Sequence, residues 1–145
     1  MVQTVVRVRF QRLCAEAVPP HYGRLGDAGM DLYSCECHTL QPGERHLFGT
    51  GLAIAIPGGY VGLVWDRSGL AASSGLTTLG GVIDSNYRGE LRVVVLNTGS
   101  EPYFVEAGHR IAQLLVQPVA SIALDEVSEL DSTERGVEGF GSSGR

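Results

Sequence analysis

The chain has 145 residues, of which 43% are hydrophobic and 19% are charged, a composition typical of one globular domain with a substantial core. Its net charge of −5 argues against a nucleic-acid partner, because nucleic-acid-coating proteins carry a basic face, but a few arginines could still bind a small anion. The N-terminus is no signal peptide and no apolar run approaches the roughly 18 residues that span a membrane, so we expect a cytoplasmic protein without a membrane partner.

The dominant pattern along the chain is an alternation of apolar and polar residues, which predicts strands. It covers residues 6–10, 52–56, 61–65, 91–96 and 111–117. Gly-containing and Pro-containing turn signals separate these runs, and the best helix candidate is a turn or two beginning near Ser68. We therefore predict an all-β sandwich or barrel over residues 1–131, followed by a Gly-rich arm over 132–145.

Three cysteines, Cys14, Cys35 and Cys37, are present without a CxxC pair or a matching Cys/His set, so the sequence indicates no zinc site. We interpret them as small thiols in a reducing compartment, where they pack as ordinary half-buried side chains.

Two stretches in the first half of the chain carry polar residues at predicted strand ends. In AGMDLYS, residues 28–34, Asp31 begins a strand, where a lone carboxylate could simply pair with an arginine. In DRSGLAASSGL, residues 66–76, Arg67, Ser68 and Gly69 lie where a strand turns into a helical turn, an arrangement suited to binding an anion. Ser68 is also a good helix N-cap, so this segment alone is weak evidence.

A third stretch, GGVIDSNYRGELRVVVLN at residues 80–97, predicts a β-hairpin with Asp84 and Tyr87 near its tip. The aspartate either caps the turn or orients and deprotonates a water molecule. In the fourth stretch, GHRIAQLLVQ at residues 108–117, Arg110 and Gln113 are three residues apart and would face opposite sides of a regular strand. The last stretch, RGVEGFGSSG, is too poor in apolar residues to fold by itself, yet it carries an aromatic ring and a guanidinium.

Taken in order, these five stretches resemble the five motifs of the trimeric dUTPase family, over residues 28–144. The resemblance implies a jelly-roll-like β-domain with one short helix, a flexible C-terminal arm, and a homotrimer with active sites at subunit interfaces. It also implies hydrolysis of dUTP to dUMP and pyrophosphate with Mg²⁺. This reaction keeps uracil out of DNA and supplies dUMP for thymidylate synthesis.

The resemblance implies a role for each matching residue. Asp84 matches the aspartate that activates the attacking water, and Tyr87 the aromatic ring that lies under the deoxyribose and leaves no room for a ribose hydroxyl. Asp31 matches an acid that supports the site through metal-bound water, so that Mg²⁺ is held by the triphosphate and waters without direct protein ligands. The other implied nucleotide contacts are Arg67, Ser68, Gly69 and Gln113 at the phosphates, Gly81, Val82, Ile83 and Arg92 at the uracil, and Arg135, Phe140, Gly141 and Ser142 in the arm.

Several positions depart from the family pattern. Asp66 stands where many relatives have proline, and we expect it to pair with a nearby arginine or to weaken phosphate binding. Thr78 stands where some relatives carry an asparagine that helps to read uracil, and we retain it among the substrate contacts. Asn86 replaces a common acid, and His109 replaces a usual acidic or other polar residue.

Two alternative functions remain. The dCTP deaminases share the fold but carry a catalytic glutamate ten residues after the hairpin aspartate, where this chain has Val94, which cannot transfer protons. A nucleotide-binding regulatory module on the same scaffold would be indicated by loss of Asp84, Tyr87 or the fifth motif, and all three are present.

Overall fold

The structure, a computed structural model, describes residues 5–141. Within these residues it contains ten strands and one short helix. In chain order they are β1 (Arg9–Arg12), β2 (Met30–Tyr33), β3 (His38–Leu40), β4 (Arg45–Ala55), β5 (Tyr60–Trp65), α1 (Ser68–Ser74), β6 (Leu76–Leu79), β7 (Val82–Ile83), β8 (Glu90–Asn97), β9 (Tyr103–Val105) and β10 (Arg110–Pro118).

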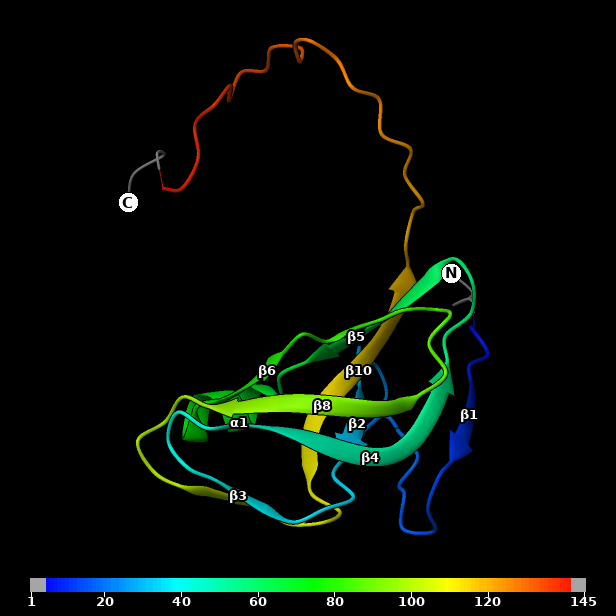
Figure 1. Ribbon diagram of the computed structural model, residues 1–145, viewed down its shortest axis with the longest axis vertical. Coiled ribbons are helices and arrows are strands. Elements are labelled where there is room, and N and C mark those ends of the chain that lie inside the picture. Colours follow the sequence, from blue (N-terminus) through cyan, green and yellow to red (C-terminus); the bar gives the residue numbers. More distant parts are fainter. Residues whose placement is uncertain (1–4, 142–145) are drawn as a thin grey trace.

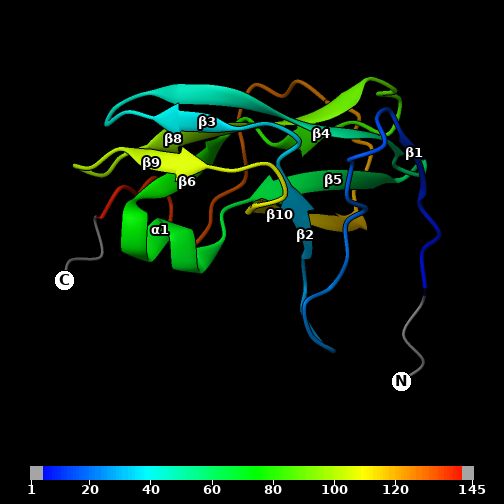
Figure 2. The same cartoon turned by 90° about the horizontal axis from the view of Figure 1, so that it is seen from below.

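Two four-stranded sheets form the body of the molecule, one in the order β1-β4-β8-β6 and the other in the order β2-β10-β5-β7. All of their pairings are antiparallel. Figure 2 shows the two sheets as stacked layers, with β3 and β9 forming a separate two-stranded sheet at one end. The predicted all-β fold with one short helix is confirmed.

The core lies between the two layers and explains the alternation in the sequence. On β8, Leu91, Val93 and Val95 are buried, while Arg92 on the opposite face is exposed. They belong to the same apolar cluster as Leu32 of β2 and residues of β5 and β10 in the other sheet. Burial of apolar surface on the facing sides of two sheets is the main stabilising contribution to such a sandwich.

The predicted runs at 61–65, 91–96 and 111–117 coincide with β5, β8 and β10, whereas the run at 52–56 covers only the last part of β4, and β3, β6 and β9 were not predicted. Two further predictions differ from the structure. The N-terminal strand β1 occupies residues 9–12 instead of 6–10, because it is defined by its pairing with the far end of β4. The predicted hairpin over residues 80–97 is wrong: β7 pairs with β5 in one sheet, whereas β8 pairs with β4 and β6 in the other. The loop 84–89 therefore connects the two layers of the sandwich, so Asp84 and Tyr87 lie on a crossover.

The chain leaves the body after β10. A hydrogen bond from the Val119 N–H to the Gly59 carbonyl is the last link to the sandwich that the described residues provide, and residues 120–138 are all exposed. Figure 1 shows this segment, coloured orange to red, extending far from the sheets. Within residues 5–141, no helix is long and apolar enough to cross a membrane.

Candidate active site

A polar pocket of about 610 Å³ lies where β2, β10 and the start of α1 meet. Eight of its eleven lining residues come from three of the five sequence stretches singled out above. The lining residues are Gly23, Arg24, Asp27, Ala28, Gly29, Asp31, Arg67, Ser68, Gly69, Arg110 and Gln113. The structure thus brings together Asp31 and all four residues that the sequence assigned to phosphate binding.

Asp31 is the electrostatic centre of this pocket. Its side chain is 14% exposed, and its Oδ1 accepts a hydrogen bond of 3.1 Å from Nε of Arg67. Its Oδ2 lies 3.5 Å from a terminal nitrogen of Arg110. A carboxylate shared by two guanidinium groups leaves a net positive charge in the pocket and fixes the direction of both arginines.

Arg110 and Gln113 both line the pocket, which overturns the expectation that they face opposite sides of β10. The pairing of β10 with β2 is irregular between Arg110 and Ala112. A bulge of this kind inserts one extra residue into a strand and shifts the alternation of its side chains by one position. For this reason the spacing of three, which separates two faces in a regular strand, here brings both side chains to one face.

Asp66 does not pair with an arginine, so that expectation is wrong. Its Oδ1 accepts hydrogen bonds from the N–H and Oγ1 of Thr78, at 2.6 and 2.7 Å, and its Oδ2 accepts one of 2.7 Å from Oγ1 of Thr77. Burial raises the pKa of the Asp66 carboxyl, but the hydrogen bonds from Thr78 and Thr77 outweigh it and leave that pKa below its usual value. The carboxylate is therefore used to hold β6, and it does not line the pocket.

The start of α1 presents backbone groups to the same pocket. Arg67 is the N-cap residue and makes no side-chain cap, so Ser68 is the first helical residue rather than the cap. The Ser68 and Gly69 side of the helix is exposed and lines the pocket. Gln113 donates its Nε2 hydrogen bond to the Asp66 carbonyl at 2.8 Å, which anchors its side chain beside this turn.

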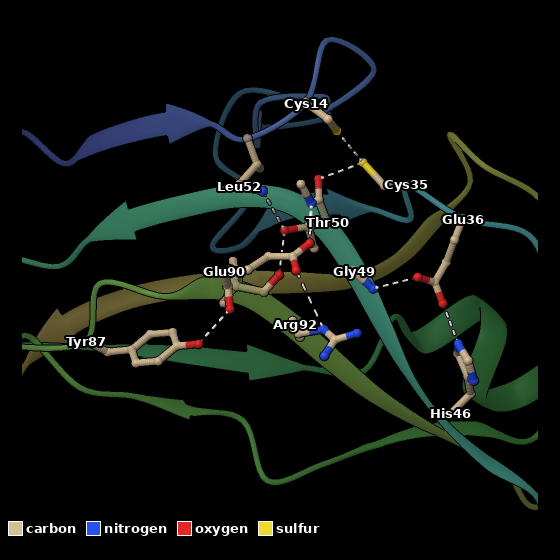
Figure 3. Close-up of polar contacts among 12 residues, drawn as sticks. Cys14, Cys35, Glu36, His46, Gly49, Thr50, Leu52, Tyr87, Glu90 and Arg92 are labelled. Atoms are coloured by element: carbon tan, nitrogen blue, oxygen red, sulfur yellow. Dashed lines mark hydrogen bonds and ion pairs between the residues drawn. The ribbon is translucent and has the colours of Figure 1, made fainter.

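Asp84 and Tyr87 lie on the crossover that follows β7. Asp84 is exposed, and its carbonyl accepts a hydrogen bond of 3.1 Å from the Tyr87 N–H, which closes a tight turn. The Tyr87 hydroxyl donates to the Glu90 carbonyl at 2.8 Å, a contact visible in Figure 3. A Cβ atom at Gly89 would lie 2.4 Å from this hydroxyl oxygen, so the phenol ring rests directly on the main chain of residue 89.

The backbone that precedes Asp84 is held against β5. Gly81 has φ +92° and its carbonyl accepts a hydrogen bond of 2.8 Å from the Val64 N–H, while a Cβ atom at position 81 would lie 2.6 Å from the Val64 carbonyl oxygen. Only glycine combines this φ with so close an approach. Val82 is 64% exposed and Ile83 is half-buried, so this edge offers open main-chain and apolar surface to a ligand.

The two groups of residues remain apart within one chain. None of the residues 78–92 lines the pocket around Asp31. A second hollow, of about 400 Å³, adjoins the crossover and is lined by Arg7, Arg9, Arg88 and Asn86 among others, but it shares no residue with the first. The chain therefore contains two half-sites, which we name the phosphate pocket (Asp31, Arg67, Ser68, Gly69, Arg110 and Gln113) and the crossover half-site (Gly81–Arg92).

Of the residues predicted in the arm, Arg135, Phe140 and Gly141 line neither hollow. Arg135 donates from Nε to the Glu138 carbonyl at 2.9 Å, and Phe140 is fully exposed with φ +53°. Gly141 follows with φ +89°, while Ser142 lies outside the described residues.

The acidic, histidine and cysteine side chains of the described residues do not converge on a metal site. Within residues 5–141, no group of three or more His, Cys, Asp or Glu side chains could hold a metal ion. Both oxygens of Asp31 face arginines, so this carboxylate is not free to act as an inner-sphere ligand as it stands.

Sequence reasoning missed two residues of these half-sites. Arg110 was left aside because it was assigned to the wrong strand face, and the bulge that corrects this has no signal in the residue types. Glu90, which accepts from Tyr87 through its carbonyl and pairs with Arg92 at 3.7 Å through Oε2, was seen only as a strand residue. An acid at the start of the strand after the SNYRG turn, with an arginine two residues further on, was the available signal.

The dUTPase family model matches residues 15–144 of this chain. Among curated proteins, the chain is 52% identical over 128 residues to the deoxyuridine 5'-triphosphate nucleotidohydrolase of Leifsonia xyli, covering 86% of this chain and 84% of the relative. It is 49% identical over 140 residues to the enzyme of the same name from Corynebacterium diphtheriae, covering 94% of this chain and 92% of the relative.

Solved structures show the same similarity in three dimensions. A dUTPase of Staphylococcus bacteriophage 80alpha with dUpNHpp superposes with a TM-score of 0.90 at 31% identity, covering 97% of this chain and 100% of the other. A dUTPase from phage phi11 of S. aureus superposes with a TM-score of 0.81 at 27% identity, covering 88% and 100%, and its structure concerns the coordination of a structural Mg(II) ion.

Proposed function

The chain belongs to the dUTPase family and hydrolyses dUTP to dUMP and pyrophosphate, and from this premise we propose how its residues divide the work. The observation that carries the proposal is the phosphate pocket, in which three of the five sequence stretches converge on one carboxylate and two arginines. In the proposal this pocket binds the triphosphate. The crossover half-site contacts the uracil and the deoxyribose and holds the attacking water.

Arg67, Ser68, Gly69 and Gln113 contact the phosphates in this proposal, and Arg110 joins them. Asp31 orients both guanidinium groups, so that they meet the phosphate oxygens without having to reorganise first. Preorganised donors of this kind are worth more in the transition state than flexible ones, since no reorganisation occurs when charge develops on the transferring group.

Asp84 is the proposed general base. Its exposed carboxylate at the end of β7 is free to orient and deprotonate a water molecule for attack on the α-phosphorus. Attack there breaks the bond to the bridging oxygen of the β-phosphate and releases pyrophosphate. The tight turn closed by the Tyr87 N–H fixes the backbone from which Asp84 projects.

Tyr87 and the backbone of residues 81–83 select the nucleoside. The phenol ring, resting on Gly89, forms a floor for the deoxyribose that leaves no space for a 2′-hydroxyl. The open main chain of Gly81, Val82 and Ile83, together with Arg92, reads the uracil edge. Thr78, whose N–H and Oγ1 donate to Asp66, is not free to donate to the uracil. A cytosine amino group opposite a backbone donor leaves a polar group unpaired, at a cost of about 1–3 kcal/mol.

Mg²⁺ is the proposed cofactor, held by the triphosphate oxygens and waters. A cation that retains much of its hydration shell and binds mainly to substrate phosphates needs no protein cage. Bound there, it would neutralise charge on the phosphates. The role of Asp31 in this proposal is to hold Arg67 and Arg110, with any contact to the metal passing through water.

The active site is proposed to form between chains of a homotrimer. Support comes from the separation of the two half-sites within one chain, since neither is complete without the other. Further support comes from Ile122, Leu124 and Leu130, which are 78%, 89% and 81% exposed on the extended segment after β10. Apolar side chains in such a segment are stabilised by packing on a partner.

We divide the chain into a β-domain, residues 1–131, and an arm, residues 132–145, that closes over bound nucleotide. Phe140 stacks on the uracil, Arg135 reaches the γ-phosphate, and Gly141 and Ser142 offer backbone and hydroxyl groups to the phosphates. Stacking of this kind is worth about 1–3 kcal/mol in proteins that bind single-stranded nucleic acids. The proposed place of action is the cytoplasm.

Pyrophosphate release from dUTP, UTP, dTTP and dCTP, each with and without Mg²⁺, tests this proposal. We expect strong preference for dUTP and a large loss of rate when the metal is chelated. Equal rates with dUTP and UTP would remove the role given to Tyr87. Sedimentation analysis of the same sample tests the trimer, and a monomer with full activity would contradict the shared site.

A further inference from the structure

Two cysteines far apart in the sequence meet over the middle of β4. The Sγ atoms of Cys14 and Cys35 lie 3.5 Å apart, and both side chains are half-buried. A Cβ atom at Gly51 would lie 2.6 Å from the first sulfur and 2.7 Å from the second, and Gly51 has φ +69°. The glycine therefore creates the space in which the two thiols touch.

The backbone holds both cysteines at this place. The Leu13 N–H, next to Cys14, donates to the Gly51 carbonyl at 2.7 Å, and the Cys35 N–H donates to the Gly49 carbonyl at 2.8 Å. Each cysteine lies in a bend between strands rather than within a strand. A disulfide has an S–S distance of about 2.05 Å, so closing the pair requires a movement of about 1.5 Å, which bends accommodate more easily than strands.

A single peptide group connects this thiol pair to the crossover half-site. The Thr50 carbonyl accepts a hydrogen bond of 3.1 Å from the Cys35 thiol. The N–H of the same peptide group, that of Gly51, donates at 2.9 Å to Oε1 of Glu90. The Glu90 carbonyl in turn accepts from the Tyr87 hydroxyl. Figure 3 shows this row of contacts from the two sulfurs to the tyrosine ring.

We propose that Cys14 and Cys35 form a reversible disulfide, and that its formation alters the position of Tyr87 through the Thr50–Gly51 peptide and Glu90. The role of Tyr87 in this inference rests on the proposed function. Hydrogen peroxide is the oxidant: an S–S bond forms, the O–O bond and two S–H bonds break, and both thiol protons leave in two molecules of water. A dithiol reductant reverses the reaction.

The local chemistry defines what changes on oxidation. Burial and the hydrogen bond with Cys14 raise the pKa of the Cys35 thiol to about 11, so in the reduced protein this sulfur keeps its proton. The protonated thiol donates a hydrogen bond to the Thr50 carbonyl. A disulfide sulfur has no proton to donate. The Thr50 carbonyl then loses its donor, while the Gly51 N–H remains paired with Glu90, so the peptide group is free to tilt toward Glu90.

The experiment uses the full chain carrying Cys37→Ser, which removes the exposed third thiol. The protein is titrated with hydrogen peroxide, alkylated and digested, and its disulfides are mapped by mass spectrometry. We expect a Cys14–Cys35 linkage within one chain, reversed by dithiothreitol. Free thiols at both positions, or a linkage between chains on a non-reducing gel, would overturn the proposal.

The kinetic half of the experiment compares KM and kcat for dUTP and UTP before and after oxidation. We expect the ratio of kcat/KM for dUTP over UTP to change about threefold or more, mainly through KM, and to recover on reduction. Cys14→Ser and Cys35→Ser should give no response. Glu90→Gln should retain the response, since its amide oxygen still accepts from Gly51, whereas Glu90→Ala should form the disulfide without a kinetic change.

The outcomes separate this inference from the proposed function. A linkage that leaves the dUTP to UTP ratio unchanged in the Cys37→Ser background would refute the coupling to Tyr87. Absence of any preference for dUTP in the reduced protein would instead contradict the proposed role of Tyr87, while disulfide mapping would still decide whether the bond forms.

Discussion

Asp31 and Arg67 hold each other within the end of the sandwich, with side chains only 14% and 27% exposed, whereas Phe140 lies fully exposed on a segment that leaves the body. Both regions are assigned to the same nucleotide. The phosphate pocket is built before substrate arrives, since its ion pairs lie within one chain. The arm has no such support among the described residues. In the proposed function, this difference means that the pocket contributes fixed charge and the arm contributes closure.

Replacing the proposed general base should have the largest effect on turnover. Asp84→Asn keeps the size of the side chain but removes its capacity to accept a proton, so kcat should fall about 10²-fold or more. Nucleotide affinity, measured by calorimetry with a non-hydrolysable dUTP analogue, should stay nearly unchanged. A variant with full activity would show that another group accepts the proton, and the phosphate pocket would then have to contain it.

Removing the arm should separate closure from folding. A chain ending after Arg135 loses Phe140 and Gly141, and its kcat/KM should fall about 10- to 100-fold. Its melting temperature should change by less than about 2 °C, because residues 136–141, the removed part that the structure describes, make no hydrogen bond to the sandwich. Differential scanning calorimetry together with pyrophosphate assays checks both values. Loss of folding would mean that the arm belongs to the core of the assembly.

Asp31→Asn should test whether the pocket is organised by its central carboxylate. The amide keeps a hydrogen-bond acceptor for Arg67 but removes the charge that both guanidinium groups share. We expect KM for dUTP to rise about tenfold with a smaller change in kcat, equivalent to about 1.4 kcal/mol of binding. Asp27→Asn, at a lining residue that neither arginine contacts, is the matched control. Similar kinetics for the two variants would contradict a preorganised pocket.

The smallest expected effect concerns stability at low pH. The pKa of Asp66 is lowered in the folded protein, so its ionised form stabilises the fold above the ordinary aspartate pKa of about 3.9. This contribution is lost as the pH falls through the lowered folded-state value. Asp66→Asn should destabilise the protein by about 1 kcal/mol at pH 7, and by less as the pH falls below about 4.

Urea denaturation at several pH values measures this difference. A penalty that stays constant down to the lowest accessible pH would show that the hydrogen bonds from Thr77 and Thr78 do not depend on the charge of Asp66.

The sequence predicted the layered all-β fold because alternation of apolar residues follows directly from burial on one face, as in β8. It also identified the three stretches whose residues line the phosphate pocket, since their residue types are distinctive. It failed where tertiary pairing decides local structure. The partner of β7 is β5, and nothing in VIDSNYRG specifies this; the same holds for the β10 bulge that turns Arg110 toward Asp31.

The prediction that Asp66 pairs with an arginine failed for a different reason. Its partners, Thr77 and Thr78, lie on the strand after α1, so only the fold brings hydroxyl donors close enough to compete with arginine. From charge alone, the Asp66 carboxylate was expected to pair with an arginine. Hydrogen bonds from Thr77 and Thr78 prevail over an ion pair because β6 already holds both donors in place.

The ring of Tyr87 rests on a position where any side chain would collide with it, since a Cβ atom at Gly89 would lie 2.4 Å from its hydroxyl oxygen. The height of the proposed sugar floor is therefore set by main-chain atoms. Main chain has no rotamers, so the position of the ring in the reduced protein changes only when the backbone itself moves, as it does in the proposed response to the disulfide. In the proposed function, discrimination between deoxyribose and ribose then depends on the position of the backbone rather than on that of a mobile side chain.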